Sequence, residues 1–303
     1  MKKLVACYYK NRGLFIMLLP ALAFLIIFSY LPIYGIVISF VEYYPKKGIL
    51  GSEWVGMKYF EQIFRDRYFW LAFRNTIIIS FLKILFGFPA PIILAILLNE
   101  IKNGKAKKIF QTITYMPHFI SWVVLAGILK EFLSPSRGAI NIILKALGAE
   151  PIFFLANAKW FRTVLVASSV WQEVGWGSII YLAAITNIDP ELYDVANIDG
   201  AGALRKIWNI TIPCIMPTIV ICGIMKVGGI VGDDFQQIYN LLNDSVIDVG
   251  QVIGTYTYER GFVNMQYSYS TAVGLFRNII AFTLVMLTNY LAKKATDGEM
   301  GIL

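Results

Sequence analysis

The sequence is poor in charged residues, in cysteine and in histidine. Only 15% of its 303 residues are charged and 57% are hydrophobic, whereas about a quarter of the residues in a soluble domain are charged. The three cysteines show no CxxC or other metal-ligand spacing, and the single histidine is His118. The cysteine spacing gives no sign of a disulfide framework or a metal site, and the one histidine lies in no pattern that indicates a Ser-His-Asp triad. We therefore expect a membrane protein with no metal site and no catalytic residues.

Two features of the sequence suggest a soluble function only at first sight. The formal net charge is +8, but the basic residues form short clusters between apolar runs, which is typical of membrane topology signals and not of nucleic-acid binding. Residues 51–56 have the GxxxxG spacing of a phosphate-binding loop, but Met57-Lys58 follows where Lys-Ser or Lys-Thr is required. We therefore expect this chain to bind neither nucleic acid nor a nucleotide.

Long apolar segments dominate what the sequence does contain. A bilayer core about 30 Å thick requires roughly 20 apolar residues of helix. Six segments reach that length, at about 14–40, 72–98, 112–130, 161–185, 212–232 and 269–291. The first is too long for the core of a signal peptide, and no small-residue cleavage site follows it. The sequence predicts an all-α polytopic protein with six spans and a single transmembrane domain over residues 1–303.

The basic clusters indicate how the spans are oriented. Segments that would lie on the side of the N-terminus are short and rich in lysine and arginine, whereas those on the other side are longer and contain fewer for their length. The clusters are Lys2, Lys3, Lys10 and Arg12, then Lys102, Lys105, Lys107 and Lys108, then Arg205 and Lys206, and finally Lys293 and Lys294. Cytoplasmic segments carry an excess of basic residues, so both termini are expected in the cytoplasm.

The loop between the fourth and fifth spans, residues 189–213, is predicted to form two helices around a glycine corner. Asp189 is a good N-cap and Pro190 suits the first helical position. Gly200 can adopt the left-handed conformation that ends a helix. A second helix is then expected over residues 201–210, ending before Pro213.

The first of these helices carries an apolar face. Leu192, Val195 and Ala196 follow the three- and four-residue spacing that places side chains on one side of a helix. An apolar face on a cytoplasmic loop requires another surface to cover it. The small residues around Gly200 would allow a close approach of that surface.

The same loop resembles the EAA signature of the inner-membrane subunits of ABC importers. The pattern is Asp194-Val-Ala, then Gly200, then Ile210-x-Ile-Pro213, with Asp for Glu, Val for Ala and Ile for Leu. The neighbouring Glu191-Leu-Tyr and Ile198-Asp-Gly-Ala segments are similar to the carbohydrate-uptake branch of that superfamily.

Further segments resemble the LplB-like complex-saccharide subgroup of these permeases. They are spread over most of the chain, and they point to a saccharide substrate, in particular an oligosaccharide. The segments are Trp54-Val-Gly-Met-Lys-Tyr-Phe60 with Asn75-Thr76, Pro117-His-Phe-Ile-Ser-Trp122, Gly138-Ala-Ile-Asn141, Trp171-Gln-Glu-Val-Gly-Trp-Gly177 and Tyr267-Ser-Tyr-Ser-Thr-Ala-Val-Gly274.

This resemblance implies a transporter assembled from several subunits in the bacterial cytoplasmic membrane. The expected partners are a second permease subunit, commonly a different chain, two ATPase subunits and an extracytoplasmic solute-binding protein. No cofactor is expected in this chain, because ATP and Mg²⁺ would bind to the ATPase subunits. The first loop helix would be the coupling helix that docks on an ATPase subunit. The coupling residues implied are Glu191, Leu192, Asp194, Val195, Ala196, Asp199, Gly200, Ala201 and Arg205.

Several charged residues fall within the predicted spans, among them Lys83, Glu173, Lys226 and Arg277. A charge at the bilayer centre costs a few kcal/mol or more, so each should face the bundle, water or a partner charge. One interpretation is a structural ion pair of Glu173 with Lys226 or Arg277. The other is a polar saccharide path, in which tryptophans offer flat faces to sugar rings. Its candidate residues are Trp122, Trp171, Gln172, Glu173, Trp176, Lys226, Asp233, Asp234, Gln236 and Arg277.

Two other function classes remain open on the sequence. A secondary transporter driven by an ion gradient could use Glu173 and Lys226 as its coupling site, but it would leave the loop at residues 189–213 without a role. A membrane scaffold or membrane enzyme is the other alternative, and the sequence offers no catalytic constellation for it.

Overall fold

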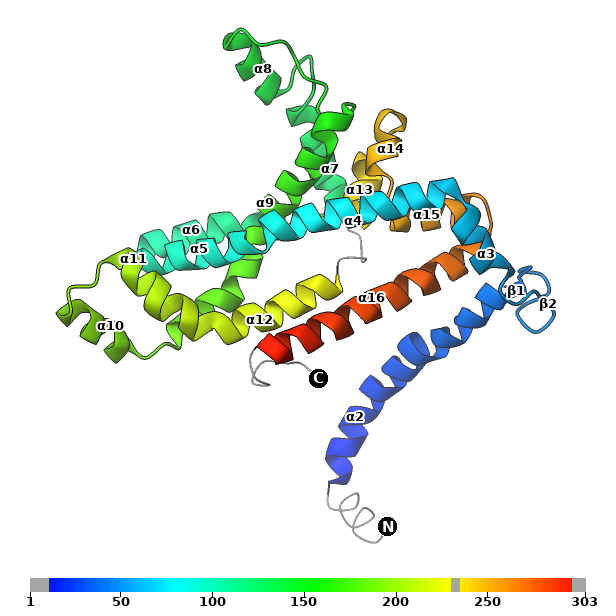
Figure 1. The fold of residues 1–303 in the computed structure, drawn as a ribbon, viewed down its shortest axis with the longest axis horizontal. Helices are drawn as coiled ribbons and strands as arrows, with labels where there is room; N and C mark the ends of the chain where they lie inside the picture. Colours follow the sequence, from blue (N-terminus) through cyan, green and yellow to red (C-terminus); the bar gives the residue numbers. More distant parts are fainter. Residues whose placement is uncertain (1–10, 230–234, 296–303) are drawn as a thin grey trace. The chain divides into compact units, whose positions relative to one another are not determined.

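A computed structural model describes residues 11–229 and 235–295 of the chain (Figure 1). Helices make up most of the described part, and its two short strands, β1 (Val41–Glu42) and β2 (Glu53–Trp54), pair antiparallel with Val41 opposite Trp54. The predicted all-α fold class is confirmed. The chain divides into two units, one of residues 1–65 and 257–275 and the other of residues 66–256 and 276–303.

The smaller unit begins with a long apolar helical run, Arg12–Phe40. It consists of α2 (Arg12–Leu25), a π-helical turn (Ile26–Tyr30) and a 3₁₀ segment (Leu31–Phe40). No residue of α2 is buried. A helix this apolar requires lipid or other apolar helices around it.

Several polar contacts connect the rest of the smaller unit. It contains α3 (Lys58–Arg65), the end of α15 (Ile253–Tyr258), a π turn (Glu259–Val263) and the start of α16 (Tyr267–Ala295), which continues into the larger unit. The backbone N–H of Tyr43 donates to Ser268 Oγ at 3.0 Å. Lys58 Nζ bonds Glu42 Oε2 at 3.1 Å and the Tyr44 hydroxyl bonds Glu42 Oε1 at 3.2 Å. Hydrogen bonds from Lys58 and then Tyr44 lower the pKa of Glu42 from its usual value.

The larger unit is built around α9 (Ala158–Thr186), which packs against three other helices: α4 (Arg67–Gly87), α5 (Pro89–Glu100) and α6 (Gly104–Tyr115) (Figure 1). Its other helices are α7 (Trp122–Phe132), α8 (Ala139–Ala146), α10 (Pro190–Ile198), α11 (Ala203–Lys206), α12 (Ile212–Gly228), α13 (Phe235–Leu241) and α14 (Ile247–Gly250).

Four helices of the described chain are long and apolar enough to cross a membrane: Arg12–Phe40, Arg67–Glu100, Ala203–Val227 and Tyr267–Leu291. They coincide with the first, second, fifth and sixth predicted spans, although the last residues of the predicted fifth span lie outside the described residues. The predicted fourth span falls in α9, whose 29 residues extend about 43 Å at 1.5 Å per residue. That helix is long enough to span but less apolar, because it carries Arg162 and Glu173. The count of six spans stays a prediction.

The predicted third span, residues 112–130, is not one straight helix. The helical segment Gly104–Phe119 and the following Trp122–Phe132 are bent by 103° relative to each other. Pro117 lies in the 3₁₀ turn Met116–Phe119 at the bend, and the carbonyl of Ile120 accepts a hydrogen bond from Gln172 Nε2 of α9 at 3.0 Å. Backbone groups at a break in a membrane helix need such partners. The sequence did not reveal this break, because its apolar pattern continues through it.

Two apolar clusters lie along α9 with a polar stretch between them. The first contains Phe161 and Leu165 together with residues of α4, α7 and α13. The second contains Tyr181, Leu182 and Ile185 together with residues of α5 and α12. Residues 169–173 of α9 fall between the two clusters, and Ser169 and Glu173 among them line the cavity described below.

A glycine on α9 sets how closely this helix approaches α6. A Cβ on Gly175 would lie against the carbonyl of Thr114, far inside normal contact distance, and 2.9 Å from the backbone nitrogen of Tyr115. The obstructing atoms belong to the backbone, so no side-chain rotation can make room. Two turns of backbone therefore touch directly at this point.

We expect Gly175→Ala to destabilise the protein by about 3 kcal/mol, at the upper end of the usual cost of overpacking. Gly127→Ala is the matched control, because a Cβ on Gly127 of α7 meets nothing within 4 Å and alanine is the better helix former. The measurement is the midpoint of thermal unfolding in detergent. Equal midpoints for the two variants would show that α9 and α6 do not touch at Gly175.

Candidate functional site

The loop after α9 folds as a capped helical hairpin. The Asp189 side chain accepts the N–H of Glu191 at 3.0 Å, and Pro190 is the first residue of α10. Gly200 has a φ of 71°, and the N–H of Ala201 donates to the carbonyl of Ala196 at 2.8 Å. The predicted cap, first helix and glycine corner are confirmed.

The expectation that the second helix ends before Pro213 is wrong. α11 continues through a π turn (Ile207–Thr211) into α12, and Pro213 lies in the first turn of α12. Proline lacks an N–H and its ring clashes with the carbonyl four residues earlier. The wider π turn lies where that clash would occur, so the helix proceeds without a stop.

Two side-chain hydrogen bonds join α10 to the second arm of the hairpin. The hydroxyl of Tyr193 and Thr211 Oγ1 lie 2.9 Å apart, and Lys206 Nζ donates to Asn197 Oδ1 at 2.9 Å. Tyr193 and Asn197 were not predicted to have a role, because these contacts depend on how the two arms fold back on each other.

The apolar face of α10 is uncovered in this chain. Leu192 is 46% exposed, Val195 58% and Ile198 86%. Ala196 and Ala201 are half-buried, and the remaining predicted coupling residues are exposed, namely Glu191, Asp194, Asp199, Gly200 and Arg205. The hairpin therefore presents an apolar strip with a charged rim, which is the composition of a docking surface.

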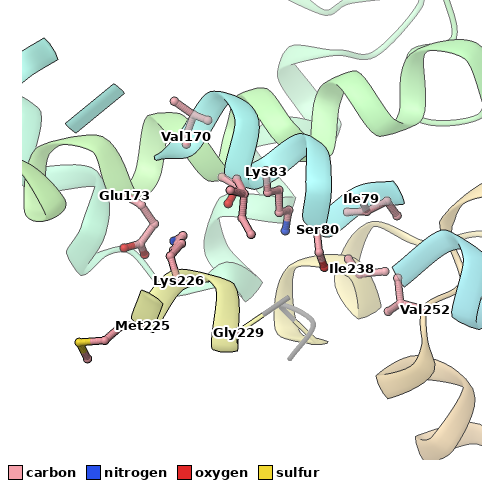
Figure 2. A pocket seen from close by; sticks show the side chains of 13 residues that line it. Ile79, Ser80, Lys83, Val170, Glu173, Met225, Lys226, Gly229, Ile238 and Val252 are labelled. Carbon is pink, nitrogen blue, oxygen red and sulfur yellow. The ribbon is translucent and has the colours of Figure 1, made fainter. Parts of the chain in front are cut away.

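A second candidate site is a cavity of about 200 Å³ between α4, α9 and α12 (Figure 2). Glu173 of α9 and Lys226 of α12 project into it from facing walls, and Lys83 enters from α4. Ser80 and Ser169 add hydroxyl groups to the lining. The remaining lining residues are Ile79, Ile84, Gly87, Val170, Met225, Gly229, Ile238 and Val252.

Glu173 pairs with His118 and not with Lys226 or Arg277 in the described part of the chain. His118 Nδ1 lies 3.3 Å from Glu173 Oε1. The imidazole ring of His118 stacks on Trp176, with 4.6 Å between ring centroids and 2° between planes. His118 therefore lies between Trp176 and Glu173, which places Trp176 next to the cavity. His118 was not among the residues predicted to line the path.

The Lys83 ammonium group contacts Gln237 Oε1. Gln237 is fully buried, and its Nε2 donates at 2.8 Å both to the carbonyl of Leu165 and to Ser168 Oγ. The amide is thus fixed by α9, so that its oxygen faces Lys83. A buried glutamine next to Gln236 had no distinguishing pattern in the sequence.

The other predicted path residues do not line this cavity. Gln172 is buried and bonded to Ile120, whereas Trp171 lines a separate apolar groove with Phe154 and Trp160. Trp122 starts α7, Gln236 is exposed on α13, and Arg277 lies half-buried on α16. Asp233 and Asp234 lie outside the described residues. Of the candidates, the structure brings Glu173 and Lys226 together, with Trp176 adjacent.

Comparisons with known proteins give consistent relatives. Residues 87–296 match the model of the binding-protein-dependent transport system inner membrane component family. The polygalacturonan/rhamnogalacturonan transport system permease protein YteP of Bacillus subtilis is 44% identical, over 99% of this chain and 93% of that protein. Protein LplB of the same organism is 41% identical, over 96% of this chain and 91% of that protein.

A solved structure shows the same fold. It is a bacterial alginate ABC transporter in complex with an alginate pentasaccharide-bound periplasmic protein, and one of its chains superposes with a TM-score of 0.90 at 36% identity. The match covers 98% of this chain and 99% of that chain. The chain therefore belongs to the family of inner membrane components of binding-protein-dependent transport systems, as an integral membrane permease with several apolar helices.

Proposed function

We propose that this chain is one permease subunit of a bacterial ABC importer and that it forms half of the pathway for an oligosaccharide. One relative is named as a polygalacturonan/rhamnogalacturonan transport system permease, and the solved relative is titled as an alginate transporter. The chain would lie in the cytoplasmic membrane with both termini in the cytoplasm. It would pair with a second permease subunit and receive substrate from an extracytoplasmic solute-binding protein, as the family description and the periplasmic protein of the solved relative suggest.

The observation that carries this proposal is the uncovered apolar face of α10 on a hairpin with fixed geometry. Leu192 and Val195 are about half exposed although the helix beneath them is capped at both ends. We propose that this face docks on an ATPase subunit, which binds ATP and Mg²⁺ and supplies the energy. Asp194 and Arg205 would pair with charges on the rim of that interface.

The hairpin is connected to the cavity by continuous structure. α10 follows the end of α9, which carries Glu173, and the Tyr193–Thr211 contact joins it to the run that becomes α12, which carries Lys226. A shift of α10 on nucleotide binding would therefore be transmitted to both walls of the cavity.

We propose that the cavity is part of the substrate path. Serine hydroxyls and charged groups on an otherwise apolar wall are suited to sugar hydroxyls and to the apolar faces of sugar rings. Trp176, about half exposed beside Glu173, would offer a flat surface for a ring. The other candidates from the sequence, Trp122, Trp171, Gln172, Asp233, Asp234, Gln236 and Arg277, remain proposals for other stretches of the path.

We expect Gly200→Trp to abolish ATP-driven uptake and to reduce co-purification of the ATPase subunits. The left-handed φ of 71° at Gly200 costs a non-glycine residue about 1–2 kcal/mol, and the indole would obstruct the docking surface. Uptake is measured in proteoliposomes with the complete importer, in the presence of an ionophore.

The matched control is Gly202→Ala, because Gly202 has an ordinary extended φ of −69° and nothing within 4 Å of a Cβ. Normal uptake and normal ATPase co-purification for Gly200→Trp would contradict the proposal. Uptake that collapses with the ionophore and needs no ATPase would favour an ion-coupled secondary transporter instead.

We expect Glu173→Gln to reduce uptake with little change in thermal stability. The Glu173 side chain is 47% exposed toward the cavity, and glutamine preserves its shape while it removes the charge that faces His118 and the substrate. Uptake rate and unfolding midpoint are measured on the same preparation. Normal uptake combined with a lower midpoint would instead assign Glu173 to a structural pair.

A further inference from the structure

We infer that the cavity selects acidic oligosaccharides, and that the ammonium group of Lys226 binds a carboxylate of the sugar. This inference rests on the proposed function, because it names the substrate class of the same path. It concerns a specificity-determining residue, and it follows from how the charges of the cavity are arranged.

The ionisable groups among the described lining residues are two ammonium groups and one carboxylate, from Lys83, Lys226 and Glu173. The described lining residues thus carry one more positive than negative charge, in a stretch of the chain predicted to lie within the bilayer. Charges act more strongly on each other there than in water, because the surroundings have a low dielectric constant. Lys83 contacts Gln237, whereas a neutral sugar would bring no counter-charge to Lys226.

The single carboxylate of the described lining lies beside an imidazole. Glu173 Oε1 lies 3.3 Å from His118 Nδ1, and Trp176 stacks on the imidazole ring. Although the two atoms are close, His118 Nδ1 makes no hydrogen bond with any described residue, so the oxygens of Glu173 are not used by it. Glu173 is then in position to accept hydrogen bonds from sugar hydroxyls next to the carboxylate-binding position.

The ammonium group of Lys226 differs from the carboxylate of Glu173, because no described residue pairs with it. Its side chain has no hydrogen bond or ion pair with any residue that the structure describes, including Glu173, although both project into the same cavity (Figure 2). An uncompensated ammonium group in a membrane span costs a few kcal/mol. A carboxylate that arrives with the substrate would remove this cost and form a charge-assisted hydrogen bond.

The remaining lining fits one uronate ring of a longer chain. Ser80 and Ser169 can bond ring hydroxyls, and Ile79, Val170 and Ile238 can contact the apolar face of the ring. A volume of about 200 Å³ corresponds to roughly seven water molecules at 30 Å³ each. The cavity can therefore hold one sugar ring at a time while the rest of the chain extends along the path.

The test compares trigalacturonate with its fully methyl-esterified form, which has the same skeleton without the negative charge. ATP-dependent uptake of both is measured in proteoliposomes with the complete importer, for the wild type, Lys226→Gln and Lys226→Arg. Since every variant uses the same binding protein, its own preference cancels when the acid-to-ester ratios are compared.

We expect Lys226→Gln to lower the acid-to-ester ratio about tenfold, and we expect Lys226→Arg to retain most of the wild-type ratio. A tenfold change corresponds to about 1.4 kcal/mol, which lies near the range for hydrogen bonds to charged groups. The control is Lys130→Gln, which removes an exposed lysine in the last turn of α7, outside the cavity. It should leave the ratio unchanged.

An unchanged ratio for Lys226→Gln would overturn the inference while leaving the proposed function intact. Absence of ATP-dependent uptake of every saccharide by the wild type would instead contradict the proposed function. If the binding protein does not deliver the ester, the acid-to-ester ratio is measured instead from binding of the two trisaccharides to the purified complex without that protein. Equal ratios there for wild type and Lys226→Gln also overturn the inference.

Discussion

The direct backbone contact between α9 and α6 at Gly175 is the constraint on which the rest of the larger unit depends. It fixes the distance of α9 from the broken helix pair, so that Gln172 reaches the carbonyl of Ile120 and Glu173 reaches His118. The two apolar clusters along α9 then stabilise its ends, and the polar stretch between them is left to face the cavity. A single glycine thus allows one helix to be both the centre of the core and one wall of the candidate site.

The same helix connects the two candidate functional surfaces. Its far end continues into the hairpin of α10, and the hairpin is bonded to the helical run that provides the opposite wall of the cavity. The π turn before α12 keeps that run unbroken despite Pro213. A continuous connection of this kind is what a permease needs if a movement of the hairpin is to change the shape of the cavity.

Local rules predicted the parts of this architecture that depend on neighbouring residues. The N-cap Asp189, the left-handed Gly200 and the apolar face of α10 all follow from short-range spacing. The four helices that are long and apolar enough to cross a membrane follow from the length of their apolar runs. The break after Pro117 was missed, because the apolar pattern continues across it and one of the contacts at the break comes from Gln172, 52 residues away in sequence.

The candidate cavity was predictable only in part, because it too depends on contacts between residues that are distant in sequence. Glu173 and Lys226 were conspicuous as charges within apolar runs, but their actual partners depend on tertiary packing. Asn75 shows the same limit: its side chain bonds the carbonyls of Asp248 and Gln251 and accepts from Arg162, which joins three distant segments. The resemblance to known permeases singled out this residue, and the structure gives its physical role.

The central claim is that the exposed face of α10 contacts the ATPase. The most direct measurement is cross-linking from single cysteines in the complete importer, after Cys7, Cys214 and Cys222 are replaced by serine. The positions are Val195 on that face and Tyr239 of α13, which is similarly exposed but packs near the opposite end of α9. The account predicts that Val195→Cys cross-links to the ATPase subunit with a short reagent and that Tyr239→Cys does not. Failure of Val195→Cys to cross-link, or equal cross-linking from both positions, would contradict it.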